Sequence, residues 1–309
     1  MEVSPNAQAC QMLNRMLRPA DAILSVWGVS AADELKILWA LLVGYFAVNL
    51  GKISGTMKSL MERVFGTDRF EFICKLTKVK HILCRFPNEP CLWATAPTWL
   101  GYWVVSPNYE PEVRQVFRPR LGEVVMDVGA NVGAYTIRLA RMVGEEGLII
   151  ALEPEPENFK CLVANMKLNK LCNVIALPWA AYERDGACIL YGRGTGSSLE
   201  MIPEGSAERI EVPTTTLDTL VRDLNVSGID WLKIDVEGAE LSVLKGADNT
   251  LQITKNLIIE VWNKNAREVF NILEHKRYEV SVLSKMDVLM NVLARQKVPQ
   301  DKVSSKAIG

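Results

Sequence analysis

Short apolar runs alternate with helical stretches from Glu123 towards the C-terminus, and this alternation constrains the fold more than any other feature. The runs at residues 124–128 and 148–152 are nearly continuous in apolar side chains, as expected for strands that are buried on both faces of a parallel sheet. Each run is followed by a helical stretch, at residues 134–142 and 156–168. The alternation predicts an α/β domain with helices on the faces of one sheet.

The remaining elements continue this pattern and end in a hairpin. We expect strands at residues 174–181, 229–235 and 257–262, and helices at residues 239–244 and 266–275. The last two strands, 278–283 and 288–294, are too close in sequence for a crossover connection, so they must pair antiparallel. For residues 121–296 we therefore predict a Rossmann-like doubly wound sheet of seven strands, mostly parallel with a C-terminal antiparallel hairpin.

The region before this domain divides into two parts. Residues 1–66 form a predicted helical extension, and residues 67–120 a small β-rich lead-in, with apolar runs at 70–76 and 101–105 read as strands. Pro111 is predicted to open a helix, because proline is favoured in a first helical turn. Residues 297–309 are expected to be a flexible tail.

The most hydrophobic stretch of the chain lies in the extension, at residues 31–50. As a helix it would be about 30 Å long, which is close to the hydrocarbon thickness of a bilayer. However, Asp33, Glu34 and Lys36 occupy its first turns, so its clean apolar length suits a buried or interfacial helix better than a spanning one. Membrane contact and packing within the protein or a homodimer are both left open.

Charge and cysteine usage narrow the function classes. With 35 basic and 36 acidic residues, the net charge of -1 gives no reason to expect a general nucleic-acid binder. The seven cysteines form no C-x-x-C pair, which favours reduced thiols in a cytoplasmic protein. Residues 52–80 carry seven Lys or Arg against three Asp or Glu, so any membrane association would be on the cytoplasmic face.

A glycine-bearing turn follows the first strand, at residues 127–133. Its glycines let the backbone approach a ligand, and the next helix N-terminus offers free N–H groups to an anionic group. Glu153, at the end of the next strand, is placed to accept the hydroxyls of a ribose. Nicotinamide and S-adenosylmethionine folds share these features, but the turn lacks the third glycine of G-x-G-x-x-G, which disfavours a nicotinamide-dependent oxidoreductase.

A second cluster lies where the strand at 229–235 meets its helix. Asp235, Glu237 and Glu240 crowd the carboxyl end of this strand, the edge at which open α/β sheets bind ligands. Carboxylates this close raise one another's pKa, as is common in functional sites. The alternative interpretation is that these acids only cap the helix N-terminus.

Together these motifs resemble the FkbM family of methyltransferases. The resemblance rests on Asp-Val-Gly-Ala-Asn-Val-Gly at 127–133, Glu-Pro at 153–154, Thr-Leu-Asp at 216–218, Lys-Ile-Asp-Val-Glu-Gly-Ala-Glu at 233–240 and Ile-Ile-Glu at 258–260. It covers about residues 109–294 and implies a class I enzyme that uses S-adenosylmethionine to O-methylate a hydroxyl of a sugar, glycolipid or secondary metabolite. A methyltransferase-like module without catalytic activity is the alternative.

The resemblance also implies residue roles. On the cofactor side it assigns Asp127, Gly129, Asn131, Gly133, Glu153 and Ala181, with Glu153 at the ribose and Ala181 near the adenine. Three carboxylates are left as catalytic candidates: Asp235 first, then Glu237 or Glu260. A histidine often follows the equivalent of Glu260 in the family, but Trp262 and Asn263 stand there in this chain.

The acceptor hydroxyl must lose a proton during methyl transfer, and a carboxylate is the expected base. A divalent ion held by Asp235 and Glu237 could instead lower the pKa of the hydroxyl, but the sequence identifies no third ligand, so we assign no metal site and leave the use of a metal open. The expected partner is a small-molecule or glycan acceptor.

Overall fold

The computed structural model describes residues 82–85, 90–95, 99–192 and 209–297. Its centre is a seven-stranded sheet in the order β11-β12-β10-β9-β3-β4-β5. Strands β12 and β10 pair antiparallel, as do β11 and β12, while the other neighbours pair parallel. The predicted doubly wound sheet with a C-terminal antiparallel hairpin is therefore confirmed. The strands are β3 Val124–Val128, β4 Leu148–Leu152, β5 Val174–Leu177, β9 Ile229–Ile234, β10 Thr254–Trp262, β11 Tyr278–Lys285 and β12 Leu289–Gln296.

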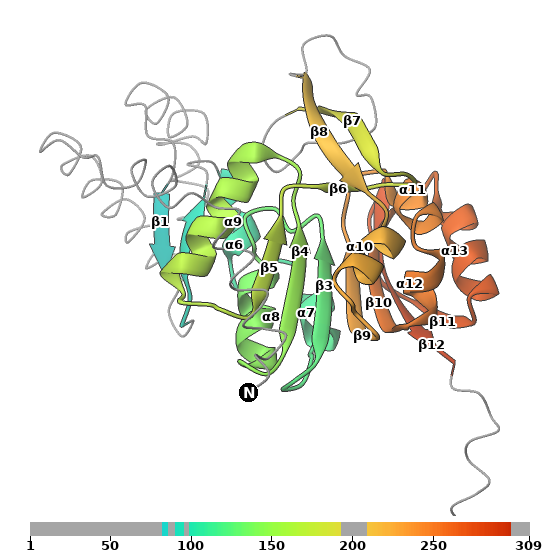
Figure 1. Cartoon of the computed structure of the whole chain (residues 1–309), viewed down its shortest axis with the longest axis horizontal. Coiled ribbons are helices and arrows are strands. Elements are labelled where there is room, and N and C mark those ends of the chain that lie inside the picture. Colours follow the sequence, from blue (N-terminus) through green and yellow to red (C-terminus); the bar gives the residue numbers. More distant parts are fainter. Residues whose placement is uncertain (1–81, 86–89, 96–98, 193–208, 298–309) are drawn as a thin grey trace, which may run out of the picture.

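Helices cover both faces of the sheet (Figure 1). Adjacent strand residues alternate between two cores, because successive side chains of a strand point to opposite faces. Val125 packs in one core with residues of α8 and α9, whereas Met126 packs in the other with residues of α10 to α13. The helices are α8 Thr136–Val143, α9 Pro156–Leu168, α10 Leu217–Asp223, α11 Glu240–Lys245, α12 Asp248–Gln252 and α13 Ala266–His275.

Strands β3 and β9 are neighbours at the point where the strand order reverses. Their register pairs Asp127 with Lys233 and Val128 with Ile234. The loop after β3 and the acids after β9 therefore leave the sheet side by side at its carboxyl edge, the usual ligand site of doubly wound folds.

A second, three-stranded sheet stands above this edge (Figure 1) and was not predicted. It has the order β6-β8-β7, with β6 Ala180–Ala181, β7 Gly186–Tyr191 and β8 Arg209–Thr215. The single strand expected at 174–181 is thus wrong in its length. Pro178 and Trp179 separate β5 from β6, and β6 pairs with β8 instead of continuing along β4.

The lead-in is partly helical. Residues 101–105 belong to α6 (Trp99–Val105), so the expected strand there is wrong. A short apolar run does not distinguish a strand from a buried helix, and Val104 and Val105 are buried as consecutive residues. The helix predicted at Pro111 is confirmed as α7 (Pro111–Val116).

The described part of the lead-in also contains a hairpin of β1 (Ile82–Arg85) and β2 (Leu92–Thr95). The helical extension 1–66 with its stretch 31–50, the run 70–76, and all of the predicted tail except residue 297 lie outside the described residues. Within the described part, no helix is long and apolar enough to cross a membrane. The domain boundaries remain predictions.

Candidate active site

Asp127 is the last but one residue of β3 and is buried in the wall of a cavity at the carboxyl edge. Its Oδ2 accepts a hydrogen bond of 2.6 Å from Thr136 Oγ1. Its Oδ1 is buried without a hydrogen-bond partner among the described residues. Burial raises the pKa of this carboxyl group. An unpartnered buried oxygen is costly, so Oδ1 is suited to accept a hydrogen bond from a ligand in the cavity.

The two glycines of the turn have different surroundings. Gly129 has a φ of +82°, and a Cβ on it would lie 1.7 Å from the backbone oxygen of Asp235. It therefore lets the turn pack against the end of β9. Gly133 has a φ of +89°, but its Cβ would meet Leu162 Cδ1 at 2.7 Å, and it is not among the residues that line the cavity. Gly133 thus serves the packing of the turn on α9.

Glu153 follows β4 and is held by backbone groups. Its Oε2 accepts from the N–H of Asn131 at 2.7 Å and its Oε1 accepts from the N–H of Glu155 at 2.8 Å. Burial raises the pKa of Glu153 to about 7. Asn131 adopts a left-handed conformation with a φ of 54°, which aims its N–H at this carboxylate. These two backbone donors fix Glu153 in the cavity wall.

The cavity measures about 230 Å³ and joins three parts of the chain. Val104 and Tyr109 come from the lead-in, and Ala180, Ala181 and Leu190 from the small sheet. Seven of the residues predicted for the site line it: Asp127, Gly129, Asn131, Glu153, Ala181, Asp235 and Glu237.

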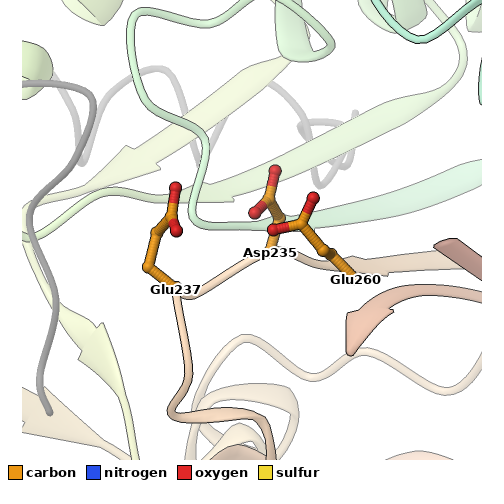
Figure 2. Close-up of side chains that lie close together, drawn as sticks. All are labelled: Asp235, Glu237 and Glu260. Carbon is orange, nitrogen blue, oxygen red and sulfur yellow. The ribbon is translucent and has the colours of Figure 1, made fainter. Parts of the chain in front are cut away.

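Three carboxylates lie close together at this site (Figure 2). Asp235 and Glu237 line the cavity, whereas Glu260 is not among the lining residues. One oxygen from each of Asp235, Glu237 and Glu260 lies within 4.8 Å of the others. Glu260 joins them because Ile259 of β10 pairs with Ile234 of β9, so that the next residues along both strands are neighbours. The sequence names Glu260 as a candidate base, but it does not show Glu260 as a third carboxylate beside the other two.

Burial governs the electrostatics of this group. Together with the charges of Asp235 and Glu240, it raises the pKa of Glu237 to about 7. Burial and the charges of Asp235 and Glu237 also raise the pKa of Glu260. Glu237 has a φ of 50°, a conformation that is rare for residues other than glycine and is concentrated at functional sites.

Lys233 was not predicted from the sequence, although it lines the cavity. Its Nζ lies 2.8 Å from Asp235 Oδ2, and its side chain is only 5% exposed. The signal was a lysine inside the apolar strand Trp231-Leu232-Lys233-Ile234, because a buried charge requires a partner. Tyr109 and Tyr135, which also line the cavity, carried no such signal.

Other residues of the motifs at 216–218 and 233–240 have structural roles. Glu240 is fully buried and accepts from the N–H of Gly238 and from Asn265 Nδ2. Thr216 caps α10 by accepting from the N–H of Thr219, and Asp218 accepts from the backbone of α12. These residues hold the site in place without lining the cavity.

Comparison with known proteins identifies this arrangement. Residues 127–280 match the model of the methyltransferase FkbM domain. The chain belongs to the FkbM methyltransferase family. Nicotinamide and S-adenosylmethionine folds share the glycine turn and the acid at the position of Glu153, and the family match decides between them. This member of the family is an S-adenosylmethionine-dependent methyltransferase.

Curated relatives agree with this assignment. Methyltransferase sdnD of Sordaria araneosa is 27% identical over 192 residues, which are 51% of this chain and 74% of the relative. Methyltransferase 1 of Beauveria bassiana is 24% identical over 51% of this chain and 73% of the relative. Hexuronic acid methyltransferase AglP of Haloferax volcanii is 30% identical over 45% of this chain and 56% of the relative.

The described residues fit the cofactor. The unpartnered Oδ1 of Asp127 offers an acceptor to its amino group, and Glu153 offers acceptors to its ribose hydroxyls. At Gly129 a side chain would collide with the end of β9, so the turn must keep the compact form that leaves room for a ligand.

Proposed function

We propose that this chain O-methylates a hydroxyl group of a small-molecule or glycan acceptor. The observation that carries the proposal is the position of Glu237, in the cavity wall beside Asp235 and Glu260. A hydroxyl that attacks a methyl group must lose its proton, and a base works best when its pKa is near the working pH. The pKa of Glu237, about 7, meets this requirement.

In the proposed mechanism the bound cofactor supplies the methyl group. Asp127, Gly129, Asn131, Glu153 and Ala181 form its binding wall. With the cofactor bound, Glu237 would accept the hydroxyl proton as the hydroxyl oxygen takes the methyl group, and the sulfur would leave as a neutral thioether. Asp235, beside Glu237 in the cavity wall, holds the acceptor hydroxyl in line, and this alignment supplies much of the rate gain in such a displacement. The sequence alone favours Asp235 as the base, but its Oδ2 is paired with Lys233.

Sugars, glycolipids and secondary metabolites are the acceptor classes that we favour. Support comes from relatives whose names specify a hexuronic acid methyltransferase and a 31-O-demethyl-FK506 methyltransferase. A screen of extracts with a cofactor that carries a labelled methyl group would find the acceptor. We expect labelled product with the wild-type chain and a loss of at least about 100-fold with Glu237→Gln, within the range of a lost general base.

Isothermal titration provides the first test of the proposal. We expect S-adenosylhomocysteine to bind and a nicotinamide dinucleotide not to bind. A folded sample that fails to bind S-adenosylhomocysteine would overturn the proposal.

Divalent metal assistance is the alternative mechanism, because three carboxylates lie within reach of one ion. Lys233 argues against it, since its ammonium already neutralises Asp235 at 2.8 Å. We therefore expect methyl transfer to survive dialysis against EDTA. Loss of activity on dialysis and its return with Mg²⁺ would establish the metal mechanism.

The cytoplasmic location, membrane contact through residues 31–50 and a homodimer remain proposals from the sequence. Sedimentation of the chain with membranes, and its loss on deletion of residues 1–50, would support membrane contact. Light scattering of the same two chains would test the homodimer.

A further inference from the structure

Two cavity-wall side chains, Lys233 and Tyr135, have no part in the chemistry proposed above. Lys233 lies beside the acid cluster, with its Nζ 2.8 Å from Asp235 Oδ2. The same ammonium lies 4.8 Å from the centre of the Tyr135 ring. The ammonium is therefore held between a carboxylate and an aromatic face, both of which attract a cation.

The charge state of Lys233 follows from its neighbours. Burial alone would lower its pKa, but the charges of Asp235, Asp127 and Glu110 outweigh burial and raise it. The side chain is thus a buried cation, and among the described residues it is the only basic side chain that lines the cavity.

Tyr135 is itself fixed from the lead-in. Its hydroxyl donates a hydrogen bond of 2.7 Å to Glu110 Oε2. Phe117 stacks on its ring, with 5.7 Å between the ring centroids. Glu110 and Phe117 flank α7, which precedes the segment matched by the family model. The lead-in therefore supports the ring that holds Lys233.

We propose that Lys233 is a positioning residue, whose ammonium fixes the Asp235 carboxylate beside the reacting centre and balances its charge. The inference rests on the proposed placement of the reacting centre at Asp235 and Glu237. With one oxygen of Asp235 bound to Lys233, its other oxygen is left for the reacting groups. The ammonium also offsets part of the negative charge of the acid cluster.

The test compares two ligands that differ in charge at the reacting centre. S-adenosylmethionine carries a positive sulfonium, whereas S-adenosylhomocysteine has a neutral sulfur at the same position. The ratio of their dissociation constants reports the local charge, and a loss of packing alone would weaken both ligands alike. Isothermal titration of both ligands at about pH 8, where Glu237 is mostly ionised, measures this ratio.

We expect three variants to change the ratio of the two dissociation constants in different directions. Lys233→Met leaves Asp235 unbalanced and should favour the cationic ligand by roughly 3- to 10-fold over wild type, a shift typical of a charge removed a few ångströms away. Asp235→Asn should shift the ratio the other way. The double variant Lys233→Met/Asp235→Asn restores the charge balance and should return close to the wild-type ratio.

Lys255 and Asp230 supply a matched control, because they form a second ion pair between β10 and β9 at the amino ends of these strands. Lys255→Met should leave the ratio unchanged. If Lys233→Met does not fold, Asp235→Asn and the double variant carry the test together: Asp235→Asn should shift the ratio against the cationic ligand, and adding Lys233→Met, which leaves no unpaired buried ion, should reverse that shift. An unchanged ratio in folded Lys233→Met or Asp235→Asn, or a double variant that keeps the shift of Asp235→Asn, would overturn the role of Lys233. Failure of both ligands to bind the wild-type chain would instead overturn the proposed function.

Discussion

Gly129 carries the chain out of β3 with a φ of +82°, in a place where a Cβ would lie 1.7 Å from the backbone oxygen of Asp235. We expect Gly129→Ala to displace the turn or the end of β9 and to abolish cofactor binding. Gly122 is the matched control, with a φ of +79° and no atom within 4 Å of the place that a Cβ would take. Gly122→Ala should cost only the backbone strain, of order 1 kcal/mol, and retain binding. Titration with S-adenosylhomocysteine and thermal melts separate the two effects.

Glu153 offers a second test at this scale. Glu153→Gln should weaken S-adenosylhomocysteine binding about tenfold, the value of a charged hydrogen bond near 1.5 kcal/mol. In the wild type, affinity should fall as the pH drops below about 7, because protonation removes acceptor capacity from this carboxylate. In the variant this dependence should be reduced.

Glu155 is the control for Glu153, because it caps α9 through the N–H of Asn158 and does not line the cavity. Glu155→Gln should change the melting temperature more than the affinity. Equal losses of affinity in the two variants would contradict the assignment of Glu153.

The part of the site that could be predicted lies at strand ends. Asp127 is the last but one residue of a recognisable strand, Glu153 and Asp235 directly follow theirs, and parallel strands bring their carboxyl ends to one edge. Lys233 and Tyr135 could not be placed, because their contacts depend on how separate elements pack. No spacing in the sequence shows that a tyrosine after the glycine turn lies against a lysine of β9.

At the scale of elements, α9 joins the lead-in to the cofactor turn through two asparagines. Asn169 binds both backbone groups of Leu92 on β2. Asn165 binds both backbone groups of Ala94, and its Nδ2 also donates to the backbone oxygen of Val132 at 2.7 Å. The side-chain amides thus take the place of a neighbouring strand along β2.

These two positions predict different outcomes. Asn165→Ala should destabilise the protein by about 1–3 kcal/mol, the cost of unpaired buried polar groups, and should also weaken cofactor binding through the turn. Asn169→Ala should lower stability but leave affinity nearly unchanged. Urea melts and titration with S-adenosylhomocysteine measure both quantities. Equal affinity of the two variants would show that the bond to Val132 does not support the turn.

The elements also differ in how well local sequence patterns predict them. Residues 156–168 and 266–275 were predicted to the residue, because proline, asparagine and amphipathic spacing mark their ends. The β6-β8-β7 sheet was missed because β6 has two residues, and its pairing joins segments about 30 residues apart. Such pairing is a tertiary property that no local periodicity encodes.

At the scale of the whole molecule, the buried acids around the cavity link stability to pH. Burial is the largest cause of the raised pKa values of Asp127, Glu153, Glu237 and Glu260. The folded protein therefore keeps protons on these groups that the unfolded chain releases. Their contribution to stability is complete below the unfolded pKa, near 4.5 for glutamate, and is lost as the pH rises through the folded values.

The pKa shifts of Asp185 and Lys233 affect stability outside this pH range. The pKa of Asp185 is lowered by hydrogen bonds from Thr216 and Thr219, so its contribution is present above pH 4 and is lost only in stronger acid. The raised pKa of Lys233 keeps its contribution constant until the pH is well above neutral. Between about pH 5 and pH 8 the buried acids should therefore set the trend.

We expect the melting temperature of the ligand-free protein to fall as the pH rises from about 5.5 to 8. The folded state binds more protons than the unfolded state, so each tenfold fall in proton concentration lowers the free energy of unfolding. Glu153→Gln, which cannot ionise, should show a smaller fall over the same range. A saturating cofactor should reduce the fall in the wild type, since its positive groups stabilise the ionised acids. Calorimetry across this range measures all three. A melting temperature that rises steadily from pH 5.5 to 8 would mean that these carboxyl groups are already ionised in the folded protein, and the case for Glu237 as a base with a pKa near 7 would fail with it.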